Sequence, residues 1–417
     1  MKFIHTADIH LDSPLQRLEA YEGAPVEEIR QASRRAFENL VDLAIDEAVD
    51  FVLIAGDLFD GDWKDYNTGL YLIKQVRRLG EAHITVFIIA GNHDAAGRMT
   101  RGLPYPDNVH LFSTRKPETQ LLETPKVAIH GQSFSRAAVT DNLASDYPDP
   151  VAGYFNVGLL HTSLTGREGH ENYAPCALDD LVNKGYDYWA LGHVHRFEIV
   201  SRDPPVVFPG CIQGRHIRET GAKGCVLVKV IEGSPPEIVR YDIDGIRWER
   251  VVVDLGGVVS VDEILERFQA AVEAVLDRHD PKPVVARVEC VGETDLHVRI
   301  AADPEHIKES VRSTAIAHFG DRAWIEKVTV GTRPPAGIAA DPGPLLELRA
   351  LVDELTASDA DLLALGQQLA TLFQKMPPDY RQGDARIKAD DPQQIRELAI
   401  QAHALLAQRL KKEAAGS

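Results

Sequence analysis

The chain has 417 residues, of which 44% are hydrophobic and 26% charged, a composition typical of a globular protein with roughly two to four domains. Its 63 acidic residues outnumber its 45 lysines and arginines, so a net charge of −18 would repel a polyanion, and a nucleic acid partner would require a local basic site. No apolar run approaches the roughly 18 residues of a membrane span, and no secretory signal pattern follows Met1. We therefore expect a cytoplasmic protein that does not insert into a membrane.

Short apolar runs alternate with helical patterns through the first half of the chain. Apolar spacing predicts helices over 27–47 and 68–79, each with one face packed on a sheet. The predicted strands cover 2–4, 51–54, 86–89, 155–160 and 188–191. This alternation predicts an α/β domain over 1–245, with a buried sheet core layered by helices.

A different arrangement begins at Trp248. It predicts a small α+β domain over 246–330, whose helices cover 261–276 and begin again at Asp303-Pro304. The predicted strands are 251–255, 284–291, 296–300 and 324–330. Residues 331–344 contain four prolines and three glycines, which indicates a linker. The last segment, 345–417, is predicted to be helical over about 345–373 and 394–410.

The four cysteines lie far apart and form no C-x-x-C pair. This spacing disfavours a disulfide framework and a cysteine-based zinc site, so we expect reduced thiols.

Five places in the α/β half share one pattern, in which an apolar strand is followed at once by residue types that bind metals. In open α/β sheets, functional groups collect where the carboxyl ends of the strands release the chain, so these residues can converge on one crevice. The motifs are Asp8-x-His10, Gly56-Asp57, Gly91-Asn92-His93-Asp94, His161 and Gly192-His193-x-His195.

This mixture of imidazoles, an amide and carboxylates suits two-metal phosphodiester chemistry. Two cations about 3.5 to 4 Å apart can clamp a phosphodiester and activate a water, and one carboxylate must then bridge both ions. Asp57, which follows Gly56, is the best placed to do so. Nitrogen and oxygen ligands together favour manganese, iron or zinc over magnesium or calcium.

The order of these motifs resembles the calcineurin-like metallophosphoesterases. The opening segment 5–14 is similar to the bacterial SbcD and YhaO branch of DNA repair exonucleases, and 246–330 resembles the capping domain of that branch. The resemblance implies an α/β metallophosphoesterase fold, two divalent cations with Mn²⁺ favoured, and a DNA substrate. It also implies a coiled-coil ATPase of the SbcC type as partner, and a second copy of the chain is a further candidate partner.

The resemblance also implies a role for each motif residue. Asp8, His10, Asp57 and His195 would hold one ion, and Asp57, Asn92, His161 and His193 the other. His93 would protonate the leaving oxygen instead of binding metal, and we expect Asp94 to orient its imidazole. Asp60 stands where some archaeal and eukaryotic relatives have a histidine, so a second active-site imidazole is not expected there.

Three basic residues near the motifs are candidates for phosphate binding. Arg215 and His216 lie in the loop 214–219, and Arg98 follows the G-N-H-D turn. The alternative is a loop held by its own ion pairs at 214–219, and a solvated arginine at 98.

The sequence therefore predicts a metal-dependent DNA exonuclease, with endonuclease activity as an extension. Two alternatives stay open: a phosphoesterase acting on nucleotides or phosphoproteins, and a scaffold with a vestigial metal site. In the last helix, Ile395, Leu398, Ala402 and Leu405 fit a short a/d seam, which indicates either internal packing or docking of the partner ATPase.

Overall fold

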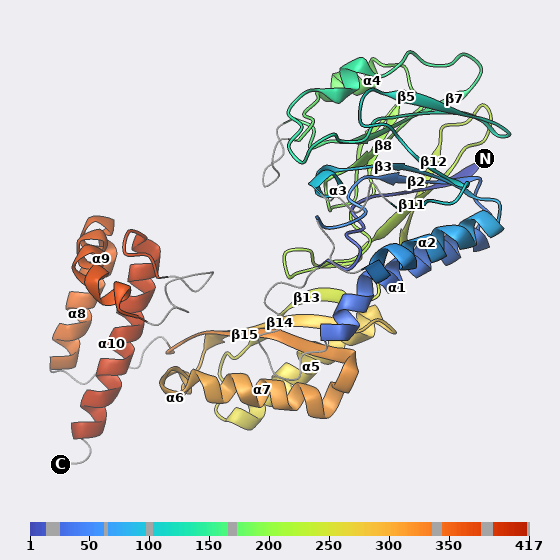
Figure 1. Ribbon diagram of the computed structural model, residues 1–417. Helices are drawn as coiled ribbons and strands as arrows, with labels where there is room; N and C mark the ends of the chain where they lie inside the picture. Colours follow the sequence, from blue (N-terminus) through green and yellow to red (C-terminus); the bar gives the residue numbers. More distant parts are fainter. Residues whose placement is uncertain are drawn as a thin grey trace. The chain divides into compact units, whose positions relative to one another are not determined.

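The computed structural model describes residues 1–13, 26–61, 66–96, 103–165, 173–335, 344–376 and 387–414. The chain divides into two compact units (Figure 1). The first comprises Met1–Arg250, Val275–Arg287 and Gly320–Glu326, and the second Val251–Ala274, Val288–Phe319 and Lys327–Ser417. The domain boundaries predicted above at 245, 330 and 344 remain predictions.

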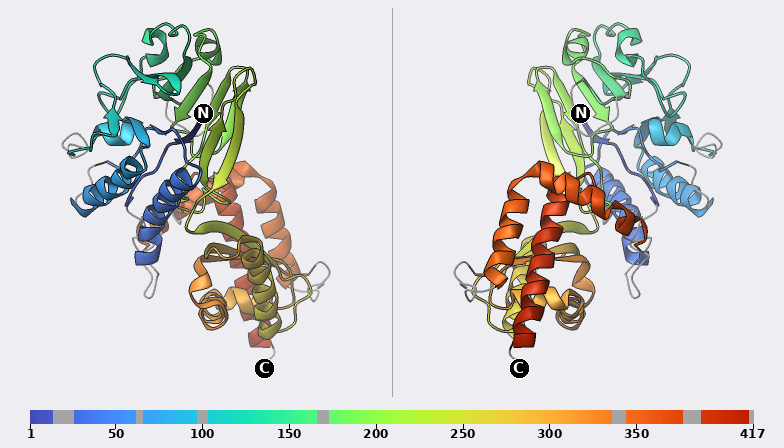
Figure 2. Two further views of the ribbon diagram at one scale, coloured as in Figure 1. Left: turned by 90° about the vertical axis from the view of Figure 1, so that its right-hand side faces the viewer. Right: turned by 90° about the vertical axis from the view of Figure 1, so that its left-hand side faces the viewer.

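The first unit contains a six-stranded sheet in the order β12-β11-β1-β2-β3-β4. Its parallel strands are β1 (Lys2–Thr6), β2 (Phe51–Ala55), β3 (Thr85–Ile89) and β4 (Val109–Leu111), and β11 (Gly224–Lys229) and β12 (Glu237–Asp242) add an antiparallel edge. Helices α1 (Val26–Asp46) and α2 (Tyr66–Glu81) lie side by side on one face (Figure 2). Leu40 of α1 and Leu72 of α2 pack there against Val52 and Ile54.

A second six-stranded sheet has the order β5-β6-β7-β8-β10-β9. Its strands are β5 (Glu118–Glu123), β6 (Lys126–Gly131), β7 (Phe155–His161), β8 (Tyr188–Gly192), β9 (Glu198–Arg202) and β10 (Pro205–Phe208). The two sheets share a core that includes Phe3, Phe51, Val157 and Tyr188. The short helices η3 (Leu143–Asp146) and α4 (Leu178–Val182) pack on the other face of this second sheet, against Trp189 and Val206.

All five strands and both helices predicted for the α/β half are confirmed within a few residues. The predicted strands are continuous apolar runs because each is buried on both faces: every residue of β2 and of β8 is buried. All four cysteines are buried free thiols, as expected.

A three-stranded sheet follows, in the order β13-β14-β15. Its strands are β13 (Arg247–Asp254), β14 (Val284–Glu293) and β15 (Ala323–Arg333), with helices α5 (Val261–His279) and α7 (Pro304–Phe319) and the short η4 (Gly320–Arg322) between them. The predicted strand over 296–300 was wrong, because this segment is helix α6 (His297–Ala302). The Thr294 hydroxyl accepts the Leu296 N–H, and the Thr294 carbonyl accepts the His297 N–H, so the chain turns before a strand can form.

Three helices complete the second unit: α8 (Pro344–Ala357), α9 (Asp359–Gln374) and α10 (Pro392–Ala414). The single helical stretch predicted over 345–373 is divided because Ser358 caps α9, its hydroxyl accepting the Asp361 N–H. Leu362 and Ile395 are buried between these helices, whereas 46% of Leu405 is exposed. Of the predicted linker, residues 331–333 belong to β15, and 336–343 lie outside the described residues.

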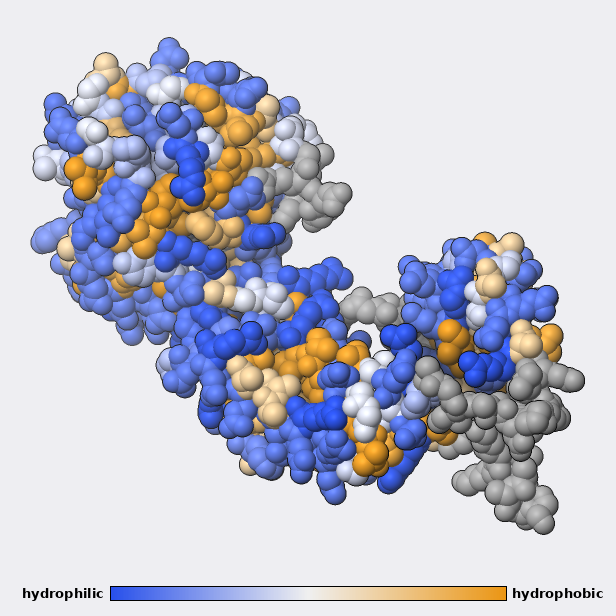
Figure 3. Space-filling model, turned by 180° about the vertical axis from the view of Figure 1, so that it is seen from behind, coloured by the Kyte–Doolittle hydropathy of each residue, from blue (hydrophilic) through white to orange (hydrophobic). Residues whose placement is uncertain are grey.

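Hydrophobic side chains reach the surface in both units, among hydrophilic ones (Figure 3). In the second unit they include Leu351 on α8, and Ile400, Leu405 and Leu406 on α10. None of the helices in the described ranges is both long and apolar enough to cross a membrane.

Candidate metal centre

The predicted ligands converge at the carboxyl ends of five strands from both sheets. Asp8 and His10 follow β1, Asp57 follows β2, and Asn92 opens the short helix α3 (Asn92–Ala96) after β3. The second sheet contributes His161, the last residue of β7, and the residues that follow β8, His193 and His195. Because β1, β2 and β3 are mutually parallel, as are β7 and β8, each sheet delivers its ligands to one edge.

Four of these ligand positions have a backbone conformation that non-glycine residues rarely adopt. Asp8, His10, Asp57 and His193 have φ values of 51°, 45°, 52° and 99°. Such left-handed residues persist only where their surroundings hold them, and they cluster at functional sites. Here the Asp8 and His10 N–H groups donate to the Gly56 and Asp57 carbonyls at 3.0 Å, so the loops after β1 and β2 hold each other.

One group of ligands consists of Asp8, His10 and His195, whose ligand atoms all lie within 4.8 Å of one another. The Nε2 atoms of His10 and His195 are 3.3 Å apart, and the His195 Nε2 lies 3.9 Å from the Asp8 Oδ1. A second group consists of Asp57, His161 and His193. Asn92 belongs with it, because its Oδ1 lies 2.9 Å from the His161 Nε2. Imidazole nitrogens with carboxylate and amide oxygens are a donor set that fits divalent cations.

The Asp57 carboxylate lies between the two groups. Its Oδ2 is 3.9 Å from the His10 Nε2 and 3.5 Å from the His161 Nε2, while its Oδ1 accepts the His93 N–H at 2.9 Å. One oxygen is therefore held by the backbone, and the other faces a histidine from each group. This is the geometry that a bridging carboxylate requires.

The glycines that precede the ligands leave room for the neighbouring ligand side chains. A Cβ at Gly56 would overlap the His161 imidazole, and one at Gly91 would overlap the Asp57 carboxylate. Gly56 also has a φ of +93°. The G-D and G-N pairs of the sequence therefore reflect close approach between the loops of the two sheets.

Two imidazoles are oriented by their second nitrogen. The Nδ1 of His161 donates to the Ala55 carbonyl at 2.9 Å, and the Nδ1 of His195 lies 2.6 Å from the Glu219 Oε1. In both rings this leaves Nε2 available to a metal, the arrangement by which buried partners commonly orient histidine ligands.

Burial determines the ionisation of the ligand residues. Desolvation lowers the pKa of His161 to about 3 and that of His10 well below its usual value, so both imidazoles are neutral and able to bind metal. The same burial raises the pKa of Asp8 to about 7 and that of Asp57 to about 6. Buried carboxylates at this density require nearby positive charge, which divalent cations would supply.

His93 is oriented by Asp60, and the prediction that Asp94 has this role was wrong. The His93 Nδ1 lies 2.6 Å from the Asp60 Oδ1. The Asp94 carboxylate instead accepts the backbone N–H groups of Leu58, Phe59 and Gly91, and thereby joins the loops after β2 and β3.

Asp60 and His93 each favour the charged form of the other. The Asp60 carboxylate accepts a hydrogen bond from the His93 imidazole, and this contact raises the pKa of His93. Although burial opposes ionisation of Asp60, hydrogen bonds from His10 and His93 hold its pKa well below the usual range. His10, Asp60 and His93 are also close enough to form a third metal-binding group, so a test of His93 must measure metal content.

The candidate phosphate-binding residues have different surroundings. The Arg215 Nη1 lies 3.2 Å from both the Asp60 Oδ2 and the Ser13 Oγ, which places this guanidinium beside the metal centre and already paired. His216 is exposed, with its Nε2 3.7 Å from the Glu219 Oε1. Loop 214–219 is thus held by its own ion pairs, as the alternative proposed. Arg98 lies outside the described residues.

Sequence reasoning did not predict the contacts of two side chains, Asp60 and Glu219, with the candidate site. Asp60 is the last residue of G-D-L-F-D, three positions after Asp57. This short spacing in the sequence could have indicated that Asp60 lies near the candidate site. Glu219 lies in a loop noted only for its basic residues, and its contact with His195 joins positions 24 residues apart. His5, by contrast, is a buried residue of β1 outside both ligand groups, with its Nδ1 3.0 Å from the Tyr188 hydroxyl and its Nε2 3.0 Å from the Leu191 carbonyl.

Comparison of the sequence with known proteins identifies metallophosphoesterases as relatives, in agreement with a metal site. Residues 1–197 match the model for calcineurin-like phosphoesterases, and residues 248–333 match the middle domain of metallophosphoesterase YhaO. The uncharacterized metallophosphoesterase YhaO of Bacillus subtilis is 39% identical over 262 residues, which cover 61% of this chain and 63% of that protein.

Two archaeal proteins named DNA double-strand break repair protein Mre11 are also similar. The Methanopyrus kandleri protein is 29% identical in a match that covers 64% of this chain and 62% of that protein. The Sulfurisphaera tokodaii protein is 26% identical in a match that covers 68% of this chain and 72% of that protein. The chain thus spans less than two thirds of the YhaO and M. kandleri proteins. Residues 1–197 therefore form a calcineurin-like metallophosphoesterase domain, in a chain homologous to YhaO and to the Mre11 repair proteins.

Proposed function

We propose that this chain is a two-metal DNA phosphodiesterase, an exonuclease with endonuclease activity as an extension, and that it acts in DNA repair. The observation that carries the proposal is the position of Asp57 Oδ2 between His10 of one ligand group and His161 of the other. Only a centre with two ions needs a shared carboxylate at this point. The names of the Mre11 relatives support DNA as the substrate.

The ligands would divide as Asp8, His10 and His195 for one ion and Asn92, His161 and His193 for the other, with Asp57 shared. When bound, the two cations would stabilise the charge that develops on the phosphate and make a water nucleophilic. We propose Mn²⁺, because a donor set of four imidazoles with oxygen ligands is poorly matched to Mg²⁺.

His93 would act as the general acid. Asp60 binds its Nδ1, so Nε2 is the nitrogen that can give its proton to the leaving oxygen. The hydrogen bond to Asp60 raises the pKa of His93, which favours the protonated imidazole that a general acid needs, and 41% of its side chain is exposed, so a substrate can reach it. Arg215 would hold Asp60 in place through the contact between its Nη1 and the Asp60 Oδ2.

The helical segment α8–α10 would dock a coiled-coil ATPase of the SbcC type. Its exposed apolar residues, including Leu351 and Leu405, support this proposal, since apolar side chains on a bundle surface often mark contact sites. Tethering to such a partner would raise the effective concentration of the nuclease on DNA.

A nuclease assay with end-labelled single-stranded and duplex DNA tests the function. Wild type should cleave DNA with Mn²⁺ and more slowly with Mg²⁺. His93→Ala should be slower by about 100-fold or more while retaining both metal equivalents by mass spectrometry. A wild type that hydrolyses nucleotides or phosphopeptides but leaves DNA intact would contradict the DNA assignment. Loss of one metal equivalent in His93→Ala would make His93 a ligand.

A further inference from the structure

An open groove of about 850 Å³ is lined by the candidate metal ligand His195 together with residues that belong to neither ligand group. Its walls are the end of the β8–β9 connection and the loop between β10 and β11, with one residue of β12. The lining includes Arg196, Arg215, Arg218, Lys223 and Arg240, with Glu219 as the acidic residue among them. This concentration of positive charge occurs in a chain with a net charge of −18.

The charge of the groove is available to a ligand. Glu219 is buried and already binds His195 and the Arg215 N–H. Arg196 and Arg218 are exposed and Lys223 is partly exposed, and none of the three makes an ion pair with any residue in the described ranges. Arg240 is paired with Asp242 at 3.6 Å, and its guanidinium lies 5.3 Å from the centre of the Phe197 ring, which holds it in place.

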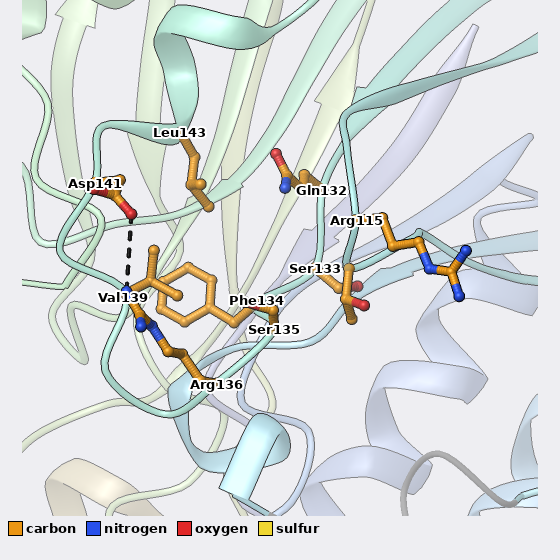
Figure 4. Close-up of a pocket in the computed structure, with 10 residues that line it drawn as sticks. Arg115, Gln132, Ser133, Phe134, Ser135, Arg136, Val139, Asp141 and Leu143 are labelled. Atoms are coloured by element: carbon orange, nitrogen blue, oxygen red, sulfur yellow. Dashed lines mark ion pairs between the residues drawn. The ribbon is translucent and has the colours of Figure 1, made fainter.

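The other cavity near the ligand loops has a different character. It measures about 240 Å³ and is lined by residues that follow β6, among them Phe134 and Val139 (Figure 4). Phe134 also packs edge-on against His161. Arg136 is paired there with Asp141 at 3.9 Å, and the Arg115 side chain extends away from Phe134 and Val139. This cavity is therefore lined by two arginines, one of them paired with an aspartate. The groove, by contrast, has three cations that form no ion pair with any described residue.

We propose that the groove binds the sugar–phosphate backbone of a polynucleotide strand, beside the phosphate that is cleaved. The inference rests on the proposed function, and it adds that the substrate is a chain with several phosphates on the His195 side of the scissile bond. Regularly spaced anions are what a row of unpaired arginines and lysines recognises without regard to sequence. A mononucleotide or a single phosphoryl group would leave Arg218 and Lys223 without a partner.

Binding to a labelled single-stranded 20-mer tests this proposal. The full-length, Mn²⁺-loaded chain carries His93→Ala, so that the DNA stays intact, and Kd is measured by anisotropy between 50 and 200 mM salt. Replacing Arg196, Arg218 and Lys223 by Gln should weaken binding roughly tenfold or more at 50 mM salt. It should also reduce the slope of log K against log salt by about 2, since each lost phosphate contact on a single strand contributes about 0.7.

The matched control replaces Lys126, Lys184 and Arg202 by Gln. Lys126 opens β6, Lys184 precedes β8, and Arg202 pairs with the first residue of β10, so all three lie at the sheet edge opposite the ligand loops. The control should bind as the parent does. Unchanged melting temperatures would show that all variants fold, because substitutions at such surface positions usually change stability by less than about 0.5 kcal/mol.

Equal losses in the groove and control variants, or no loss in the groove variant, would overturn the proposal. The nuclease assay on wild type separates the two ideas. If wild type cleaves DNA but the groove variant binds DNA as tightly as its parent, the proposed role of the groove is wrong and the proposed nuclease function stands. If the groove variant binds DNA more weakly but wild type cleaves no DNA, the proposed role of the groove stands and the proposed nuclease function is wrong.

Discussion

The His93 imidazole is held by Asp60, whose Oδ1 lies 2.6 Å from the His93 Nδ1. Asp94, which directly follows His93 in the chain, binds the backbone of the loops after β2 and β3 instead. The two carboxylates therefore have separable roles. Asp60 contacts His93, the proposed proton donor, and Asp94 joins the loops that carry the proposed ligands.

Asp60→Asn should lower the rate of DNA hydrolysis by roughly 10- to 100-fold, because the amide keeps the shape but loses the charge that raises the pKa of His93. The acid–base profile is the informative readout. The Asp60 carboxylate raises the pKa of His93, so its loss should shift the alkaline limb of kcat to lower pH. An unshifted limb would show that Asp60 is not the partner of His93 in catalysis.

Asp94→Asn should instead lower the free energy of unfolding by about 1 to 3 kcal/mol, because an amide satisfies fewer of the three backbone N–H groups. The kcat of the remaining folded protein should stay close to wild type. Chemical denaturation and kinetics on the same preparation measure both quantities. A stable Asp94→Asn protein with a large kcat defect would restore Asp94 as the catalytic partner.

Asp57→Asn should weaken both metal sites, since its Oδ2 faces His10 and His161 together. His195→Ala removes a ligand from one group and should mainly weaken one site. Mn²⁺ titration by calorimetry distinguishes one affected site from two. If both variants lose a single site to the same extent, Asp57 does not bridge.

His5 should make the first unit less stable in mild acid. Burial lowers its pKa in the folded chain to about 3, whereas an unfolded histidine titrates near 6.5. Below pH 6.5 the unfolded chain thus binds the extra proton, and stability falls as the pH falls towards 3. For one histidine this costs about 2 kcal/mol between pH 7 and pH 5.

Denaturation of the metal-free chain, followed by tryptophan fluorescence, measures this effect, because Trp189, Trp248 and Trp324 all belong to the first unit. His5→Gln should lose about 2 kcal/mol less than wild type between pH 7 and pH 5. His83→Asn, at an exposed position, should retain the wild-type dependence. Identical pH dependence in wild type and His5→Gln would remove His5 as the cause.

The last helix contains both a core residue and a candidate docking residue. Ile395 is buried, so Ile395→Asp should destabilise the helical bundle by several kcal/mol. Leu405 is 46% exposed, so Leu405→Asp should leave the melting temperature nearly unchanged while weakening the complex with the partner ATPase. Circular dichroism and co-purification measure the two effects. An unfolded Leu405→Asp bundle would place Leu405 in the core and remove the docking argument.

Most of the α/β framework was recognisable from the sequence, and the seven proposed ligands could be expected to meet, as they do in the structure. A strand buried on both faces must be apolar throughout, so β1, β2, β3, β7 and β8 are visible as short apolar runs. Parallel strands end at a common edge, so ligand residues directly after them could be expected to meet. The prediction failed at 296–300, where alternating apolar residues suggested a strand but Thr294 starts a helical turn.

The tertiary structure decided the partners of those ligands. The contacts of Asp60 with His93, of Glu219 with His195 and of Asp57 with His161 join residues 24 to 104 positions apart, and no local spacing predicts which carboxylate faces which imidazole. Adjacency in the chain favoured Asp94 for His93, but its carboxylate is used by backbone N–H groups that only the folded loops bring to it. The basic groove is likewise invisible in the overall charge, because its cations come from three separate segments, the β8–β9 connection, the β10–β11 loop and β12, that the fold brings together.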